Sequence, residues 1–163
     1  MHRAARGGVR NVLERVGVGG TMNVRDPREE HELPAPPVVF PGQRGPESAY
    51  RVGHDLLSRR AAAEAMTVLE PALEQDPANT GLRSLRAWAY LIRVQLAKAE
   101  AELRALVEET PDDVWARHAL GRALERQSRL AEALPHLRLA FAMSGDVDHE
   151  VAVLRVERLL MTD

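Results

Sequence analysis

The chain has 163 residues, a formal net charge of −2 and no cysteine, and only 4% of its residues are aromatic. This length predicts one main domain whose modest core is built from Ala, Leu and Val, without disulfides or thiolate metal ligands. The small net charge gives no basis for bulk attraction to nucleic acid or to anionic lipid, and no apolar run approaches the roughly 20 residues that span a bilayer, so we expect a soluble, cytoplasmic protein.

Residues 1–45 differ in composition from the rest. They carry seven Arg and five acids, a net +2, whereas residues 46–163 carry a net −4. Within them, residues 1–25 hold five Arg and a single acid, which resembles a basic leader or arm. Two interpretations stay open for this part: an arm that binds nucleic acid or acts as a leader, and a non-native extension before a true start at Met22. Of the 22 basic residues in the chain 21 are Arg, which together with many Ala is typical of GC-rich, bacterial coding.

A Pro-rich stretch follows the basic residues. Residues 34–41 read PAPPVVFP and predict an extended, polyproline-like conformation. Such a run is a weak recognition motif for an aromatic groove and is more often a linker. We therefore expect residues 1–45 to be a disordered basic and Pro-rich arm.

Helical periodicity is nearly unbroken from Pro46 onwards. Asn79 and Asp113 are expected to cap the helices that follow them, because Pro77 and Pro111 end the preceding helical patterns. The short connections within each pair of helices predict antiparallel neighbours. Helices are predicted at residues 48–58, 61–75, 80–93, 97–109, 114–127, 129–143 and 148–161.

The helical region repeats itself every 34 residues. Small residues superpose on small ones and large residues on large ones, which indicates a repeat array. The small residues let two helices approach closely while the leucines fill the space around the crossing. The superposed sets are Gly53, Ala87 and Gly121; Leu56, Tyr90 and Leu124; Ala65, Ala99 and Ala133; Leu69, Leu103 and Leu137; and Pro77, Pro111 and Gly145.

These positions resemble the tetratricopeptide repeat family. The resemblance is carried by GHDL (53–56), AWAY (87–90), GRAL (121–124), the alanines of the second helices and the closing prolines. It implies an all-α, right-handed superhelical solenoid of helix-turn-helix repeats, whose concave face is lined by the first helix of each pair. The expected repeats are 46–79, 80–113 and 114–147, followed by a capping helix at 148–161.

The sequence departs from the family pattern at several positions. The tryptophan that the family often places early in the first helix is replaced by Ala49, Arg83 and Arg117. Arg86 occupies a place that is usually apolar, so we expect the second pair to be slightly rotated. Two prolines, Pro71 and Pro135, fall inside predicted second helices and should bend them mildly without breaking them.

Projecting the remaining positions of the first helices inward gives a candidate peptide-binding groove. Aromatic and aliphatic side chains edged by arginines suit an extended peptide, or a helix that carries an acidic group. An alternative stays open for Trp88 and Trp115, which would also be explained by packing between repeats. The groove residues are Tyr50, His54, Trp88, Leu91, Ile92, Trp115, His118, Arg122 and Arg126, and the same projection includes Leu57, Ser84 and Glu125.

Some members of the family grip the C-terminal carboxylate of chaperones with asparagines and lysines on this face. No Asn or Lys lies in any predicted first helix of this chain, which disfavours that co-chaperone function. The leading hypothesis is a non-catalytic scaffold that binds a peptide or helix of a partner protein. The alternative is a self-associating assembly protein, possible as a homodimer, because the helix at 148–161 has more apolar surface than a single cap needs.

Nothing in the sequence indicates catalysis, a cofactor or a metal. The six histidines have no ligand spacing, and a surface or half-buried position is expected for each. Gly17, Gly19 and Gly20 lack both the preceding strand and the third spaced glycine of a dinucleotide fingerprint. The acids Glu100, Glu102, Glu108 and Glu109 are expected on a solvated helix face, with ordinary pairing to Arg104.

Overall fold

The computed structural model describes residues 33, 35–36 and 46–162, and those from Leu33 onwards belong to one compact unit. The described residues form α-helices joined by short turns, with no strand among them. Each helix boundary lies within two residues of its predicted position, so the prediction of an all-α helical repeat is confirmed. The helices are α1 (Pro46–Ser58), α2 (Ala62–Gln75), α3 (Thr80–Ile92), α4 (Leu96–Glu109), α5 (Val114–Arg126), α6 (Leu130–Ser144) and α7 (Val147–Thr162).

The predicted basic arm at residues 1–25 lies outside the described residues. So does most of the Pro-rich stretch, of which Leu33, Ala35 and Pro36 are described. None of these three residues is helical.

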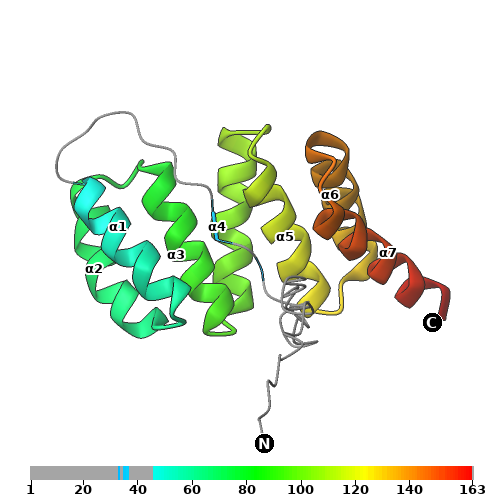
Figure 1. The fold of residues 1–163 in the computed structure, drawn as a ribbon, viewed down its shortest axis with the longest axis horizontal. Helices are drawn as coiled ribbons and strands as arrows, with labels where there is room; N and C mark the ends of the chain where they lie inside the picture. Colours follow the sequence, from blue (N-terminus) through cyan, green and yellow to red (C-terminus); the bar gives the residue numbers. More distant parts are fainter. Residues whose placement is uncertain (1–32, 34, 37–45, 163) are drawn as a thin grey trace, which may run out of the picture. The chain divides into compact units, whose positions relative to one another are not determined.

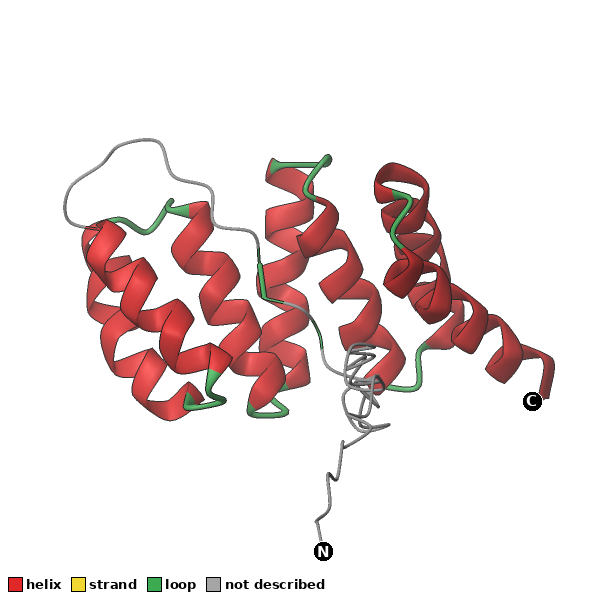
Figure 2. Cartoon of the chain, viewed as in Figure 1, coloured by secondary structure: helices red, strands yellow, loops and turns green. Residues whose placement is uncertain are grey.

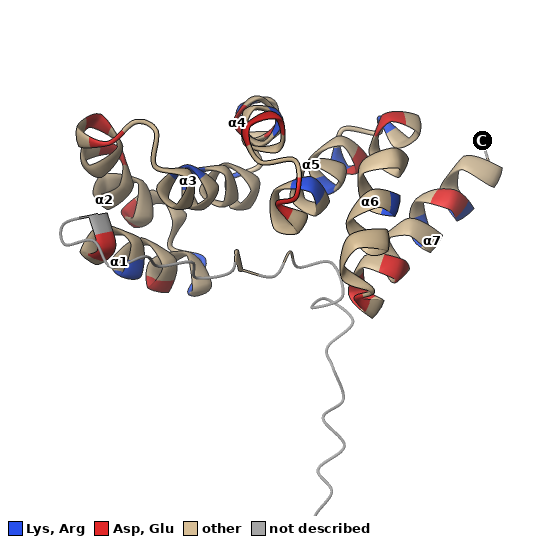
Figure 3. Cartoon of the chain, turned by 90° about the horizontal axis from the view of Figure 1, so that it is seen from above, with Lys and Arg blue, Asp and Glu red and all other residues tan. Residues whose placement is uncertain are grey.

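The helices pack on one another in the order of the chain. Each contacts the next, and in addition α1 contacts α3 and α5 contacts α7. Figure 1 shows them as a row from α1 to α7, joined by the short turns that are green in Figure 2. Viewed from above, α1 and α4 lie on opposite sides of α3 (Figure 3). Because each pair contacts only its neighbours, the helices form a helical-repeat solenoid.

Two side chains start the first helices of the second and third pairs. Asn79 Oδ1 accepts a hydrogen bond from the amide of Leu82 at 3.1 Å, and Asp113 Oδ1 accepts one from Ala116 at 2.9 Å. These contacts satisfy amides that have no partner inside the helix, and they confirm both predicted N-caps. Gly145 ends α6 in a left-handed conformation, with a φ of 66°, and its amide donates to the carbonyl of Phe141. A glycine tolerates this conformation without strain.

Small residues bring the two helices of a pair together. Ala87 and Ala99 are fully buried in the second pair, as Ala133 is in the third. A Cβ added at Gly121 would lie 2.6 Å from Cδ2 and 2.7 Å from Cγ of Leu137, so there is no room for one without displacing that leucine. The close approach predicted from the sequence is therefore present at the crossing of α5 and α6.

Helices α2 and α6 continue through their internal prolines. Pro71 lies within α2 and Pro135 within α6, and neither helix is interrupted. Each proline removes one backbone hydrogen bond, but buried apolar residues on either side keep each helix packed. In α6 these are Leu137 and its neighbours Ala133 and Ala140.

The expectation of a solvated face is wrong for Glu100 and Glu102 of α4, whereas Glu108 and Glu109 are exposed. The side chain of Glu102 is only 11% exposed and bonds Arg83 Nε at 2.7 Å and Arg86 Nη2 at 2.6 Å. Arg83 also bonds Glu109. The arginines that interrupt the apolar pattern of α3 therefore find their partners on the second helix of the same repeat.

Glu100 links the second repeat to the third. Its carboxylate accepts hydrogen bonds from Arg104 in the same helix and from Gln127 and Arg129 in the turn between α5 and α6. Burial alone would raise the pKa of Glu100, but the hydrogen bonds from Gln127, Arg104 and Arg129 lower it. Glu100 reaches the third repeat because α4 packs against both α3 and α5, so the polar residues of α4 face neighbours on two sides.

Candidate functional site

The predicted groove residues lie on α1, α3 and α5, whose shared surface we call the first-helix face. At its N-terminal end three rings come together. The rings of Tyr50 and His54 are stacked with centroids 6.1 Å apart, and His54 lies 5.8 Å from the ring of Trp88. Tyr50 and His54 are one helical turn apart on α1, and Trp88 comes from α3. Because Tyr50 is buried, its pKa is raised, so the phenol stays neutral.

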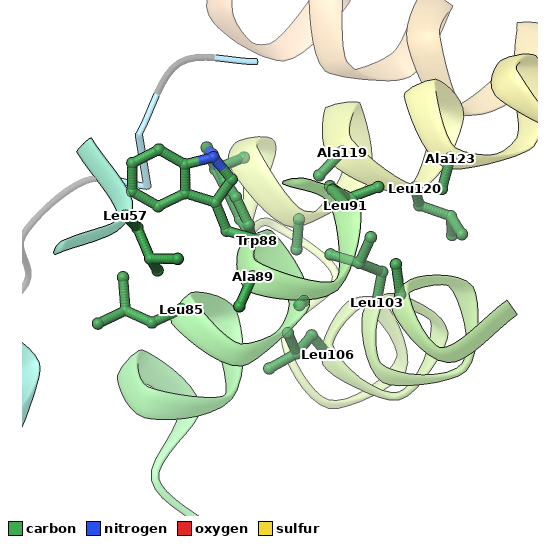
Figure 4. Packing of buried hydrophobic residues seen from close by; sticks show 14 of the residues in the cluster. Leu57, Leu85, Trp88, Ala89, Leu91, Leu103, Leu106, Ala119, Leu120 and Ala123 are labelled. Carbon is green, nitrogen blue, oxygen red and sulfur yellow. The ribbon is translucent and has the colours of Figure 1, made fainter. Parts of the chain in front are cut away.

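Trp88 projects from α3 on the side opposite to α4. Figure 4 shows it pointing away from Leu103 and Leu106 of α4, with Leu57 of α1 nearby. Trp88 is 7% exposed and belongs to the buried core. Leu91, one turn further along α3, is also buried, whereas Ile92 is only half-buried. The face therefore offers the edge of an apolar surface and not a row of fully exposed rings.

The α5 part of the candidate site is mostly interior. Trp115 is 7% exposed and His118 is 5% exposed, so both side chains contribute more to the core than to an open surface. The expectation of a surface or half-buried position is wrong for His118 and also for His149, which is 8% exposed. The reason is that α7 packs on α5, where the ring of His149 stacks on that of His118 with centroids 4.1 Å apart.

The two predicted arginines have different surroundings. The side chain of Arg122 is 12% exposed and lies 3.4 Å from the carboxylate of Glu125. Burial lowers the pKa of Arg122, against the opposing effect of Glu125. Arg126 is exposed, and its Nη1 donates a hydrogen bond to the carbonyl of Leu91 at 2.9 Å, which joins α5 to the end of α3. Arg126 is thus the more accessible cation of the pair.

Sequence reasoning missed the contribution of α7 to this region. Arg155 forms two hydrogen bonds with the carboxylate of Glu125, at 2.6 and 3.0 Å. Ser144 Oγ lies 2.7 Å from Nδ1 of His149. The spacing between Glu125 and Arg155 is 30 residues and follows no helical period, so the sequence alone carries no signal for this contact.

The arrangement shows no sign of metal chemistry. Among the described residues no group of three or more His, Asp or Glu side chains could hold a metal ion. No helix in the same part of the chain is long and apolar enough to cross a membrane. What the face offers chemically is apolar contact, the half-buried ring of His54 and the accessible guanidinium of Arg126.

Comparisons with known proteins agree with the resemblance seen in the sequence. A family model described as tetratricopeptide repeat matches residues 56–123. Residues 56–123 therefore carry the tetratricopeptide repeat pattern. This match covers the end of α1 through most of α5 and includes Trp88, whereas Tyr50 and His54 of the ring cluster precede it. No curated protein matches the chain.

Solved tetratricopeptide repeat domains have the same fold. The Sgt2 domain from Aspergillus fumigatus is 20% identical, with a TM-score of 0.68 over 77% of this chain and 85% of that one. The OM64 domain of Arabidopsis is 22% identical, with a TM-score of 0.64 over 69% and 93%. The second such domain of human RPAP3, in complex with the HSP70 peptide SGPTIEEVD, is 19% identical, with a TM-score of 0.61 over 69% and 98%. At these identities the likeness concerns the fold.

Proposed function

We propose that the protein is a non-catalytic interaction module, a scaffold that binds a peptide or a helix of a partner protein along the first-helix face. The observation that carries this proposal is the ring cluster of Tyr50, His54 and Trp88, which two helices assemble at one end of the face. Rings and arginines are the side chains most enriched at protein interfaces. A partner that carries an acidic group would meet Arg126, whose planar guanidinium can bind a carboxylate through two hydrogen bonds.

The solved structures support binding of this kind. The RPAP3 domain, which shares the fold, was solved with a bound HSP70 peptide. The first helices of the present chain contain neither Asn nor Lys, so a partner held by a clamp of those residues is disfavoured. The arginine-rich composition is typical of GC-rich, bacterial coding, so we propose that the partner is a protein of the bacterial cytoplasm.

Charge reversal on the two faces of the solenoid tests the proposal. The face variant combines Ile92→Asp with Arg126→Glu, because Ile92 is half-buried and Arg126 exposed on the first-helix face. The control variant is Lys98→Glu, which reverses an exposed cation on the second helix α4. Partners are identified by cross-linking in native lysate, and the identified partner is then titrated against purified wild-type and variant proteins. We expect the face variant to lose at least about tenfold in affinity, or roughly 1.4 kcal/mol, and the control to bind like the wild type.

Circular dichroism must show that the face variant is folded, because Arg126→Glu also removes the hydrogen bond to Leu91. A folded face variant that binds the partner as tightly as the control contradicts the proposal, since it places the partner elsewhere on the solenoid.

A second candidate function, self-association, is favoured by α7. This helix buries Ala152, Val153 and Val156 against the rest of the solenoid. Its other side carries apolar residues that are exposed at spacings of one helical turn, which is the pattern of an unpartnered apolar face. These residues are Val147, Val151, Leu154 and Met161.

Sedimentation distinguishes the two candidates. If α7 docks a second copy, the wild type sediments as a dimer whose population rises with concentration, and Val151→Asp with Leu154→Asp shifts it to the monomer. A wild type that stays monomeric at every concentration rules out this candidate and leaves the first-helix face untouched.

A further inference from the structure

Three residues before the first helix lie against the repeats. Leu33 and Ala35 are half-buried and pack against the hydrophobic core, and Pro36 is buried. Since none of the three is part of a helix, the packing of Leu33 and Ala35 is a contact between an N-terminal segment and the solenoid.

The contact is on the first-helix face. Figure 3 shows the described residues of this segment on the side of α3 that faces away from α4, and in Figure 1 they pass in front of α4. Trp88 projects to the same side of α3, away from Leu103 and Leu106 (Figure 4). The segment and the ring cluster of the candidate site therefore share one surface.

The chemistry of the segment matches that of the surface. The described residues of the segment, Leu33, Ala35 and Pro36, are all apolar and at least half-buried. Pro36 fixes its own backbone angle, so ordering such a segment costs less conformational entropy. Arg126 donates to Leu91 and Arg122 lies beside Glu125, so both cations have neighbours within the solenoid. Apolar contact is what the face offers most.

We propose that the first-helix face is a receptor for short, extended, apolar segments containing proline, and that Leu33, Ala35 and Pro36 occupy it within the same chain. A partner segment must then have the same chemistry and must displace them. This inference rests on the proposed function. It adds the chemical class of the ligand and a segment of the same chain that competes with the partner.

The length of chain that joins the segment to α1 sets how much the segment weakens the binding of a free peptide. Nine residues of sequence, 37–45, lie between Pro36 and Pro46, where α1 begins. A short flexible link gives an effective concentration of the order of 1 mM. A free peptide with an intrinsic dissociation constant of about 0.1 mM would therefore bind the intact chain roughly tenfold more weakly than a chain whose own segment cannot bind.

The test uses a labelled synthetic peptide, HELPAPPV, which copies residues 31–38. Fluorescence anisotropy measures its affinity for the full chain and for the double variant Leu33→Asp with Ala35→Asp. The control, Val94→Asp with Leu139→Asp, adds the same two charges at exposed positions. We expect the segment variant to bind the peptide roughly tenfold more tightly than both the wild type and the control. Equal affinities in all three proteins, or no binding in any of them, overturn the proposal.

A second measurement detects the contact within the chain. Since the sequence has no cysteine, Glu32→Cys carries a single spin label next to Leu33. We expect broadening of an indole N–H signal from Trp88 or Trp115 that persists on dilution and disappears when Leu33→Asp and Ala35→Asp are added. Broadening that is absent, or that survives these substitutions, contradicts the intramolecular contact.

The two proposals fail separately. If the peptide and spin-label results are negative while the face variant Ile92→Asp with Arg126→Glu still loses its partner, the intramolecular contact is wrong and the proposed function stands. If the peptide binds as expected but the partner binds the face variant as tightly as the wild type, the intramolecular contact stands and the proposed function is wrong.

Discussion

Three residues at equivalent places in the turns have left-handed backbones. Arg60, Val94 and Ser128 have φ angles of 62°, 58° and 61°, and they are 34 residues apart. In each turn the next residue donates its amide to a carbonyl five residues earlier, as Gln95 does to Tyr90 at 2.8 Å. The turn geometry is thus repeated, but Val94 is a β-branched residue in a conformation that such residues rarely adopt.

Replacing Val94 by glycine should stabilise the protein. The left-handed conformation costs a non-glycine residue roughly 1–2 kcal/mol, and Val94 is 63% exposed, so little packing is lost. We expect Val94→Gly to raise the free energy of unfolding in urea by about 1 kcal/mol, after allowing for the greater chain entropy of glycine. The matched control is Val52→Gly, an exposed valine inside α1, which should lower it by about 0.5 kcal/mol or more. If Val94→Gly and Val52→Gly change the free energy of unfolding in the same direction, the backbone at Val94 is not strained.

At the level of helices, the docking of α7 on α5 depends on a buried histidine. The ring of His118 is stacked on His149, and its Nδ1 is buried without a hydrogen-bond partner among the described residues. Burial lowers the pKa of His118 to about 3, helped by His149, Arg122 and Arg155. The other charged group at this contact is Glu125, which is bonded to Arg155. Protonation of His118 in the folded protein is therefore strongly disfavoured.

This arrangement predicts a loss of stability in mild acid. The pKa of His118 is about 3 in the folded state and 6.5 in the unfolded chain. Between pH 3 and pH 6.5 the unfolded chain therefore binds a proton that the folded chain does not. The stability that neutral His118 contributes is complete above pH 6.5 and falls as the pH drops. The expected loss is about 2 kcal/mol between pH 7 and pH 5.

Urea unfolding at several pH values measures this slope in the wild type and in His118→Phe, which keeps a ring in the stack but cannot titrate. We expect the phenylalanine variant to have a clearly shallower slope. His136, whose pKa burial also lowers, contributes in the same direction in both proteins, so the difference between them isolates His118. Parallel slopes contradict the prediction whatever the absolute stability of the variant.

The helices could be predicted from the sequence because their signals are local. Asn79 and Asp113 cap helices within three residues of themselves, and Pro77 and Pro111 act on their immediate neighbours. The 34-residue period adds a check, since each signal occurs more than once. For this reason the helix boundaries needed no knowledge of the packing between helices.

Partners across helices could not be predicted in the same way. Helical periodicity says which face carries Glu100 but not that Arg129 of the next repeat lies 2.7 Å from it. It placed His118 on the first-helix face without indicating that α7 would cover it. The described segment at Leu33 is too short to show a period, so its packing against the repeats gave no signal in the sequence.

On the scale of the whole molecule, stability should decrease from the centre of the solenoid to its ends. Helix α4 packs against both α3 and α5, and its Glu100 ties the second repeat to the third. Among the described helices α7 packs mainly against α6, and its last residues Leu159, Leu160 and Met161 are exposed. In a solenoid the stability of each unit is its own plus that of its contacts with neighbours, so a terminal helix opens more easily than a central one.

Native-state hydrogen exchange measures this gradient. We expect amides of α3, α4 and α5, including those of Ala87 and Ala99, to exchange with the free energy of global unfolding, because they lie at the most enclosed helix crossing. Amides in the second half of α7 should exchange through local opening that is easier by at least about 2 kcal/mol. Protection of α7 equal to that of α4 in a dilute sample contradicts the gradient. If that protection appears only on concentration, a second copy covers the exposed side of α7, because association stabilises the helix in proportion to the logarithm of the protein concentration.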